Sequence, residues 1–182
     1  MDNKFFSDLE RAVIGRNPVA FERLQPGLSV AEIQQQLNRG GVVGDFHPLL
    51  NFFSWRNGSK PSDKSLSETS LFPHSVFQFL PLDIGIGHFC RFTITAEVTR
   101  GIEPLFSRLS DIATRYFPIF WDSGHGYLAV DLQASSDGRI VLLEFESDDP
   151  LRQAYGSLDA FLEDAIRANV ANEPLLCFRI SR

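Results

Sequence analysis

Apolar residues recur at helical spacing near both ends of the chain and in part of its middle. Phe5, Leu9 and Val13 lie four residues apart and predict a short first helix. Ser29 is a favourable N-cap for a second helix, and Pro48 suits the first turn of a third. The same spacing predicts helices over 30–38, 48–55, 104–116 and 158–166, the last with Ser157 as its N-cap.

Other segments have the period of a β-strand. From Cys90 to Val98, apolar and polar residues alternate, which is typical of a strand with one buried face. Shorter strand patterns cover 127–132, 140–145 and 175–180. The Asp137–Gly138 dipeptide favours a hairpin turn between two of them, and a tight hairpin joins only antiparallel strands.

This order of elements predicts an α+β fold. We expect a single domain over residues 1–182, with an antiparallel β-sheet and helices packed against one face. Residues 58–70 are polar and rich in serine, so they are predicted to form a mobile loop. The residues before this loop carry apolar faces that need the sheet to cover them, which argues against a separate domain.

Composition narrows the classes of protein to consider. The chain has 182 residues, 43% of them hydrophobic, and a net charge of −6 with a pI of about 5.2. An acidic chain is poorly suited to bind nucleic-acid phosphates. No apolar run approaches the roughly 20 residues that span a membrane, and the N-terminus lacks the pattern of a signal peptide. Cys90 and Cys177 have no metal-site spacing and are expected to be buried free thiols, which fits a cytoplasmic protein.

The most distinctive stretch is 116–131, where an aromatic run leads through two glycines into a strand. Gly124 and Gly126 allow a sharp turn, and Asp122 is a residue type that hydrogen-bonds turn amides. One interpretation is a metal or acid–base site made of Asp122, His125 and Asp131. Against it, the chain has no second cluster of ligands and none of the usual hydrolase, P-loop or dinucleotide motifs. We therefore expect no catalytic residue, metal or cofactor.

Two further groups of residues have a structural and a functional interpretation. Trp55 is expected in the core, and Asn57–Gly58 is expected to end its helix. Glu144 and Glu146 begin an acidic run that continues to Asp149. The run is either the solvated face of a strand or a negative patch that meets a basic partner.

In their order along the chain, these features resemble the SUKH superfamily, which includes the fungal SMI/KNR cell-wall-assembly regulators and many bacterial toxin-immunity proteins. The resemblance extends over roughly residues 24–166, whereas residues 83–104 depart from the pattern and predict an extra strand or hairpin. It rests on the helix 29–38, the helix ending at Trp55 with Asn57–Gly58, the run Phe117–Pro118–Ile119–Phe120, the turn Gly124-x-Gly126–Tyr127, the strand ending in Asp131, the Asp137–Gly138 hairpin and the helix beginning Ser157–Leu158–Asp159.

The resemblance implies a non-catalytic, protein-binding domain. In bacteria its members are thought to neutralise toxins, often nucleases, and others act as regulatory scaffolds, which is the alternative here. We therefore expect a protein partner, and neither a nucleic acid nor a membrane. Exposed aromatic residues beside carboxylates are good interface anchors, so the expected contact residues are Trp121, Asp122, His125, Tyr127, Glu144 and Glu146. Pro118, Gly124, Gly126 and Asp131 are expected to shape the motif.

Overall fold

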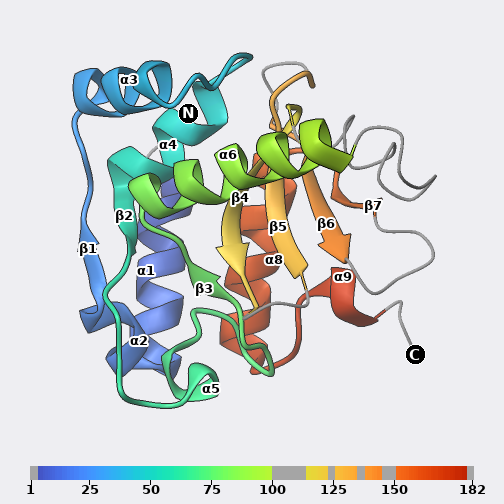
Figure 1. Ribbon diagram of the computed structural model, residues 1–182. Coiled ribbons are helices and arrows are strands. Elements are labelled where there is room, and N and C mark those ends of the chain that lie inside the picture. The colour runs from blue at the N-terminus through green and yellow to red at the C-terminus, as the bar shows by residue number, and fades with distance from the viewer. Residues whose placement is uncertain (1–3, 100–113, 123–125, 135–137, 145–150, 180–182) are drawn as a thin grey trace.

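The computed structural model describes residues 4–99, 114–122, 126–134, 138–144 and 151–179. These residues form an antiparallel five-stranded sheet in the order β3-β4-β5-β6-β7, which confirms the α+β class (Figure 1). Its strands are β3 Gln78–Phe79, β4 Tyr116–Trp121, β5 Gly126–Asp131, β6 Ile140–Glu144 and β7 Leu151–Tyr155. A separate antiparallel pair joins β1 Leu24–Pro26 to β2 Arg56–Ser59.

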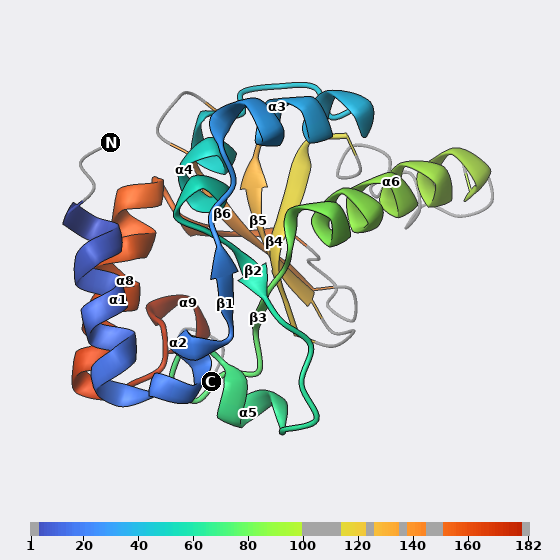
Figure 2. The ribbon, with the colours of Figure 1, turned by 90° about the vertical axis from the view of Figure 1, so that its left-hand side faces the viewer.

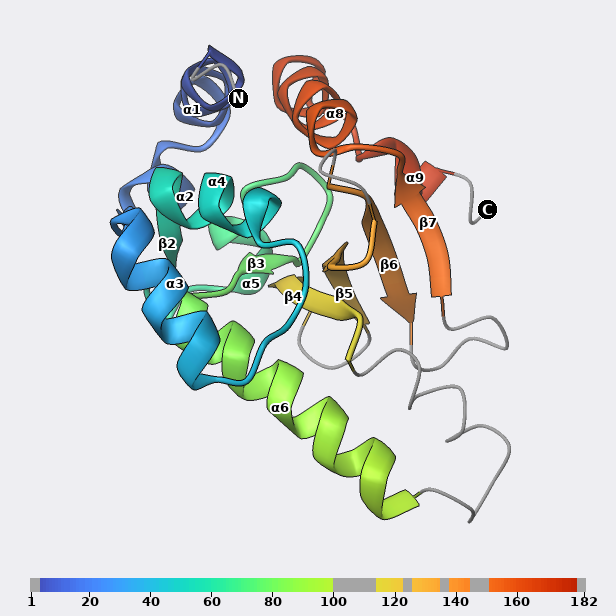
Figure 3. The ribbon, with the colours of Figure 1, turned by 90° about the horizontal axis from the view of Figure 1, so that it is seen from above.

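Helices cover the sheet from both sides. The described helices are α1 Lys4–Arg16, α2 Pro18–Glu22, α3 Val30–Arg39, α4 His47–Trp55, α5 Leu66–Thr69, α6 Leu82–Thr99, α8 Leu158–Ala171 and α9 Leu176–Arg179. Helices α4 and α8 pack on one face of the sheet, and α1 lies beside α8 (Figure 2). The view from above shows that α6 crosses the opposite face of the sheet (Figure 3). The sequence predicts helices on one face only, whereas the structure has them on both.

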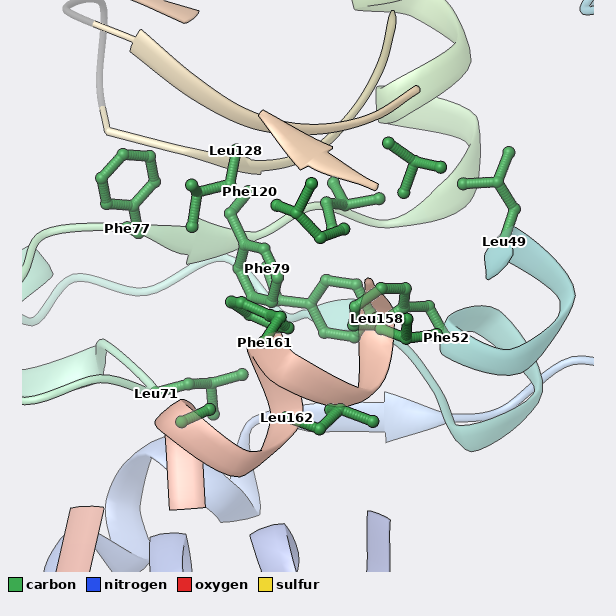
Figure 4. Close-up of a cluster of buried hydrophobic side chains, with 14 of the residues drawn as sticks. Leu49, Phe52, Leu71, Phe77, Phe79, Phe120, Leu128, Leu158, Phe161 and Leu162 are labelled. Atoms are coloured by element: carbon green, nitrogen blue, oxygen red, sulfur yellow. The ribbon is translucent and has the colours of Figure 1, made fainter. Parts of the chain in front are cut away.

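The main core lies between the sheet and α4 and α8, and phenylalanines dominate it. The ring centroid of Phe120 in β4 lies 5.0 Å from the ring centroids of Phe72 and Phe79, and 5.8 Å from that of Phe161 in α8. Phe52 of α4 meets Phe161 at 6.0 Å (Figure 4). Aromatic pairs at these separations stabilise a core beyond the area that they bury.

A second, smaller core lies on the other face of the sheet. Side chains alternate along a strand, so Leu128 of β5 enters the main core whereas Tyr127 and Ala129 enter the second one. Phe92 of α6 and Trp121 of β4 pack against this second cluster and are partly exposed. The sheet is therefore buried on both faces along β4 and β5.

Local capping signals place several elements as predicted. Ser29 and Glu32 form a capping box at the start of α3, and the side chain of Ser157 accepts a hydrogen bond from the amide of Ala160 in α8. β5 and β6 pair as an antiparallel hairpin, and Gly138 has a φ of 68°, as a tight turn requires. Val30 is the exception in α3, because 49% of its surface is exposed where the helical pattern predicts burial.

The predicted strand over 90–98 is wrong, because these residues belong to α6. The helix begins earlier, and residues at helical spacing bury one of its sides: Leu82, Gly85 and Phe89. Asn57 completes the start of α6, since its Oδ1 accepts a hydrogen bond of 2.9 Å from the amide of Leu82. A cap from a residue 25 positions away leaves no local signal, and the period-two pattern misled the prediction.

The aromatic run after the predicted helix 104–116 is itself a strand. Of that helix, residues 104–113 lie outside the described residues, and Tyr116 begins β4. β4 does not alternate because both of its faces are buried. Pro118 fits within it because the register shifts between Pro118 and Phe120, a bulge that accommodates a residue without an amide hydrogen.

The remaining differences lie near the C-terminus and in the polar segment. The predicted strand 175–180 is wrong over its described part, where Leu176–Arg179 form the short helix α9, and β7 was not predicted. In the segment 58–70, the first two residues belong to β2 and Leu66–Thr69 form α5. Asn17 donates a hydrogen bond to the carbonyl of Glu68, which ties α5 to the end of α1.

Candidate functional site

The candidate site lies where β4 ends and β5 begins. Trp121 and Tyr127 are cross-strand partners, and the carboxylate of Asp122 accepts a hydrogen bond of 2.5 Å from the amide of Gly126. The amide of Asp122 donates in turn to the carbonyl of Gly126, at 3.3 Å. Asp122 therefore closes the turn as expected, while Gly124 and His125 lie outside the described residues.

Gly126 is required by a close approach of two strands. A Cβ on Gly126 would overlap the backbone carbonyl oxygen of Leu143 on β6. The absence of a side chain lets β5 and β6 remain paired up to the turn, where Gly126 faces Glu144. The second glycine of the motif thus has a packing role.

Two side chains of α6 complete an aromatic group around Tyr127. A hydrogen bond of 2.8 Å joins the hydroxyl of Tyr127 to Nδ1 of His88, whose ring centroid lies 5.6 Å from that of Trp121. Phe92 meets the edge of Tyr127 at 5.2 Å. His88 and Phe92 were missed because their segment was predicted as a strand. Their spacing of four residues, which places them on one side of a helix, was the available signal.

The electrostatics of this group favour neutral side chains. Burial, reinforced by the charge of Asp122, raises the pKa of Tyr127 to about 12. Burial, reinforced by the charge of Arg91, lowers the pKa of His88 below its ordinary value. At neutral pH the pair is therefore an uncharged phenol and an uncharged imidazole, which suits a fixed contact surface.

Trp121 ends β4 with its ring partly exposed. Its Nε1–H is buried and has no hydrogen-bond partner within the described part of the chain. A buried donor without an acceptor costs about 1–3 kcal/mol, so a partner that offered an acceptor to this N–H would stabilise the position.

Asp131 lies at the other end of β5 and has a structural role. It is buried, and its two carboxylate oxygens accept hydrogen bonds of 2.8 and 2.7 Å from Arg115. Burial alone would raise the pKa of Asp131, but hydrogen bonds from Arg115 and Gln133 and the charges of Arg115 and Arg139 lower it. This ion pair holds the segment before β4 against the end of β5.

The geometry does not support a metal or acid–base site on Asp122, His125 and Asp131. Asp131 lies five positions after Gly126, which Asp122 contacts, so the strand carries it about 16 Å away at ~3.3 Å per residue. Ligands of one ion lie about 2.0–2.6 Å from it, so Asp122 and Asp131 cannot share one. Within the ranges that the structure describes, no three His, Cys, Asp or Glu residues are grouped to hold a metal.

The structure brings Glu144 to the site but separates Trp55 from it. Glu144 faces Gly126 across the strands and lies 3.7 Å from Arg152 as an ion pair, whereas Glu146 lies outside the described residues. Trp55 stacks on Phe6 at 5.0 Å beside the main core.

The prediction that Asn57 and Gly58 end the helix of Trp55 is wrong, because α4 ends with Arg56 as its extended C-cap and both residues lie in β2. Asn57 caps α6, as described above, and Gly58 has a φ of 70°. Both cysteines are free, Cys177 buried as predicted and Cys90 only partly buried.

Comparison with known proteins assigns no family: no protein-family model and no curated protein matches the chain. Among the helices that the structure describes, none combines the length and apolar character needed to cross a membrane.

Proposed function

We propose that this chain is a protein-binding domain whose partner sits on the Trp121 surface, defined as Trp121, Asp122, Tyr127 and Glu144 with His88 and Phe92 of α6. The observation that carries this proposal is Trp121 itself. Its ring is partly exposed at the end of a fully paired strand, and its Nε1–H has no acceptor among the described residues.

Trp121 has the properties of an interface anchor. Tryptophan is enriched among the residues that dominate binding energy, and here its ring is held against His88 and the second core. A ring already fixed in place loses little conformational entropy when a partner covers it. A small rotation that brings Nε1 to an acceptor on the partner would also give this buried donor a hydrogen bond.

The partner we propose is a toxin domain with a basic surface, and the chain acts as its immunity protein. Two observations support this choice: the resemblance of the motif series to toxin-immunity proteins, and the net charge of −6. Opposite charge speeds the encounter of two proteins and makes it sensitive to salt. A regulatory scaffold would use the same kind of surface but would bind host proteins instead.

The test is to express the chain with a toxin domain encoded beside its gene, measuring both the affinity and the survival of cells that make the toxin. We expect the wild-type chain to protect cells. We expect Trp121→Ala to bind at least about tenfold more weakly, the loss typical of an anchor residue, and to lose protection.

Val43→Ala is the matched control, because Val43 is 77% exposed and lies outside the Trp121 surface. It should bind and protect as wild type does. Trp121→Phe, which keeps a ring but removes the N–H, separates loss of the donor from loss of packing. Wild-type affinity and protection by a folded Trp121→Ala variant would contradict the proposed surface. Binding of host proteins without any toxin would favour the scaffold.

A further inference from the structure

A cavity of about 610 Å³, broadly open to solvent, lies where the last turn of α1 meets the last turn of α8. These helices lie side by side in Figures 2 and 3, on the side of the sheet opposite α6 and the Trp121 surface. Much of the lining is apolar, from Ala12 and Gly15 on α1 and Ile166 and Val170 on α8. Its size falls within the range of about 300–1,000 Å³ that is typical of small-molecule sites.

Arg16 is the charged group that lines this cavity without a carboxylate partner among the described residues. Its Nε donates to Oδ1 of Asn169 at 2.6 Å and its Nη2 donates to the carbonyl of Ser70 at 3.0 Å, and both acceptors are neutral. The other arginine of the lining, Arg11, pairs with Asp8 at 3.3 Å. The partly buried Arg56 and Arg115 pair with Glu10 and Asp131.

Within the described residues, the surroundings of Arg16 therefore supply no carboxylate to pair with its charge. Burial lowers the pKa of Arg16, whereas hydrogen bonds to Asp131 raise the pKa of Arg115. A guanidinium that is partly removed from water gains most from an anion that can accept two of its N–H groups. Arg16 thus supplies an anchor for a carboxylate beside the apolar part of a cavity that Asp8, Arg11, Asn169 and Asn172 also line.

Two features of the site oppose an anion. One is the carboxylate of Asp8, which lines the cavity and pairs with Arg11. The other is the pair of helix ends. Both helices end at the cavity, and helix carboxyl ends carry partial negative charge. At α8 this effect is reduced, because the amides of Asn172 and Glu173 donate to the carbonyl of Ala168. The apolar walls must therefore contribute part of the binding free energy, which selects a ligand with an apolar chain.

We propose that this cavity binds an organic carboxylate with a short apolar chain. The carboxylate accepts hydrogen bonds from Arg16, which Asn169 holds in place through its Oδ1, and the chain lies on Ala12, Ile166 and Val170. The proposal is independent of the Trp121 surface and of any protein partner.

The first test uses hexanoate and hexanol as probes, with amide chemical shifts of the full chain as the readout. We expect both to shift residues of the last turns of α1 and α8, with hexanoate bound about tenfold more tightly because of the charge-assisted hydrogen bonds. In Arg16→Gln that preference should disappear while hexanol still binds, which shows that the cavity remains. Equal binding of hexanoate and hexanol by wild type, or no binding of either, would overturn the proposal.

A second pair of variants tests where hexanoate binds and leaves Arg16 unchanged. A Cβ on Gly15, which lines the cavity, or on Gly87 of α6 would meet no atom within 4 Å, so both glycines accept a side chain. Gly15→Leu should fill the cavity and weaken hexanoate at least about tenfold, whereas Gly87→Leu should leave it unchanged. Equal affinities in the two variants would place hexanoate elsewhere and refute the site.

A further binding experiment distinguishes two sources of the carboxylate, a peptide C-terminus and a small free acid. An acetylated tripeptide ending in a free leucine carboxylate is compared with hexanoate and with the same peptide amidated. Tighter binding of the free peptide identifies a peptide C-terminus as the ligand class, and tighter binding of hexanoate identifies a small free acid. Binding of the amidated peptide as tightly as the free one would contradict the role of Arg16.

Discussion

Gly58 lies in β2 with a φ of 70°, and a Cβ on it would overlap the backbone of Leu80 and Pro81. Both the left-handed backbone and the close approach exclude other residue types. We expect Gly58→Ala to lower the free energy of unfolding by about 2–3 kcal/mol, the scale of a strained backbone position. Urea denaturation followed by circular dichroism measures this change.

The control is Gly87→Ala, because Gly87 lies within α6 in open space. Alanine is favoured over glycine in a helix interior by about 1 kcal/mol, so this variant should be more stable than wild type. A similar loss of stability in both variants would show that the position of Gly58 is not special. Destabilisation by Gly87→Ala alone would argue against the helix.

The Asp131–Arg115 pair makes stability depend on pH. The lowered native pKa of Asp131 lies below its ordinary value of 3.8, so folding favours the ionised carboxylate. The stabilisation is fully present well above pH 3.8, begins to shrink below about pH 5, and is lost as the pH falls through the native pKa. We expect Asp131→Asn to cost about 2–4 kcal/mol at pH 7, since it leaves Arg115 without its buried partner.

The measurement is the difference in unfolding free energy between wild type and Asp131→Asn across a pH series. That difference should be constant from pH 7 down to about 5 and shrink at lower pH, as linkage requires. A difference that stays constant down to pH 2 would contradict the assigned protonation behaviour of Asp131.

At the scale of elements, one buried carboxylate helps to hold α9 to the rest of the fold. Asp164 of α8 accepts hydrogen bonds from the hydroxyl of Tyr155 at 2.7 Å and from the amide of Leu176 at 2.8 Å. It therefore joins β7, α8 and α9. We expect Tyr155→Phe to destabilise the protein by about 1–3 kcal/mol, because a buried charged acceptor loses a donor. Thermal unfolding measures the loss.

Tyr116→Phe is the matched control for this substitution. Tyr116 is also buried, at 5% exposure, and its hydroxyl has no hydrogen-bond partner within the described residues. Loss of the Tyr116 hydroxyl should change the free energy of unfolding by less than about 0.5 kcal/mol. Equal effects of the two substitutions would indicate that the hydrogen bond to Asp164 contributes nothing.

The elements that the sequence predicts correctly are those whose signals are local. Ser29 and Ser157 cap their helices with side chains three residues from the amides that they bind. Helix α6 and the short α9 depend instead on Asn57 and Asp164, which cap them from distant positions. Strand β4 lacks alternation because tertiary packing buries both of its faces. Such contacts cannot be read from the order of residues.

The residues of the candidate site also divide into those that a local sequence motif predicts and those that only tertiary packing brings together. Trp121, Asp122 and Tyr127 stand close together in the sequence, and the turn motif pointed to them. His88 and Phe92 reach the site only because α6 crosses the outer face of the sheet. Asp131 belongs to the same motif, but the length of β5 carries it to the opposite end of the strand.

At the scale of the whole molecule, the sheet separates two hydrophobic cores, and each holds one of the two tryptophans. Trp55 packs against the main core and Trp121 against the smaller one. Every residue of β5 is buried, and its side chains contribute to both cores. One core therefore cannot lose its packing while the other stays intact without disrupting β5. A single-domain chain of this kind should unfold in one cooperative step.

The variants Trp55→Phe and Trp121→Phe each leave one tryptophan as a fluorescent reporter of one core. Within each variant, we expect the urea midpoint from fluorescence to equal the midpoint from far-ultraviolet circular dichroism, because both cores share the strands of one sheet. Comparing two probes in the same variant removes the effect of the substitution on stability. If the Trp121 signal changes at a lower urea concentration than the circular dichroism does, the smaller core unfolds separately. The prediction of a single domain over residues 1–182 would then be wrong.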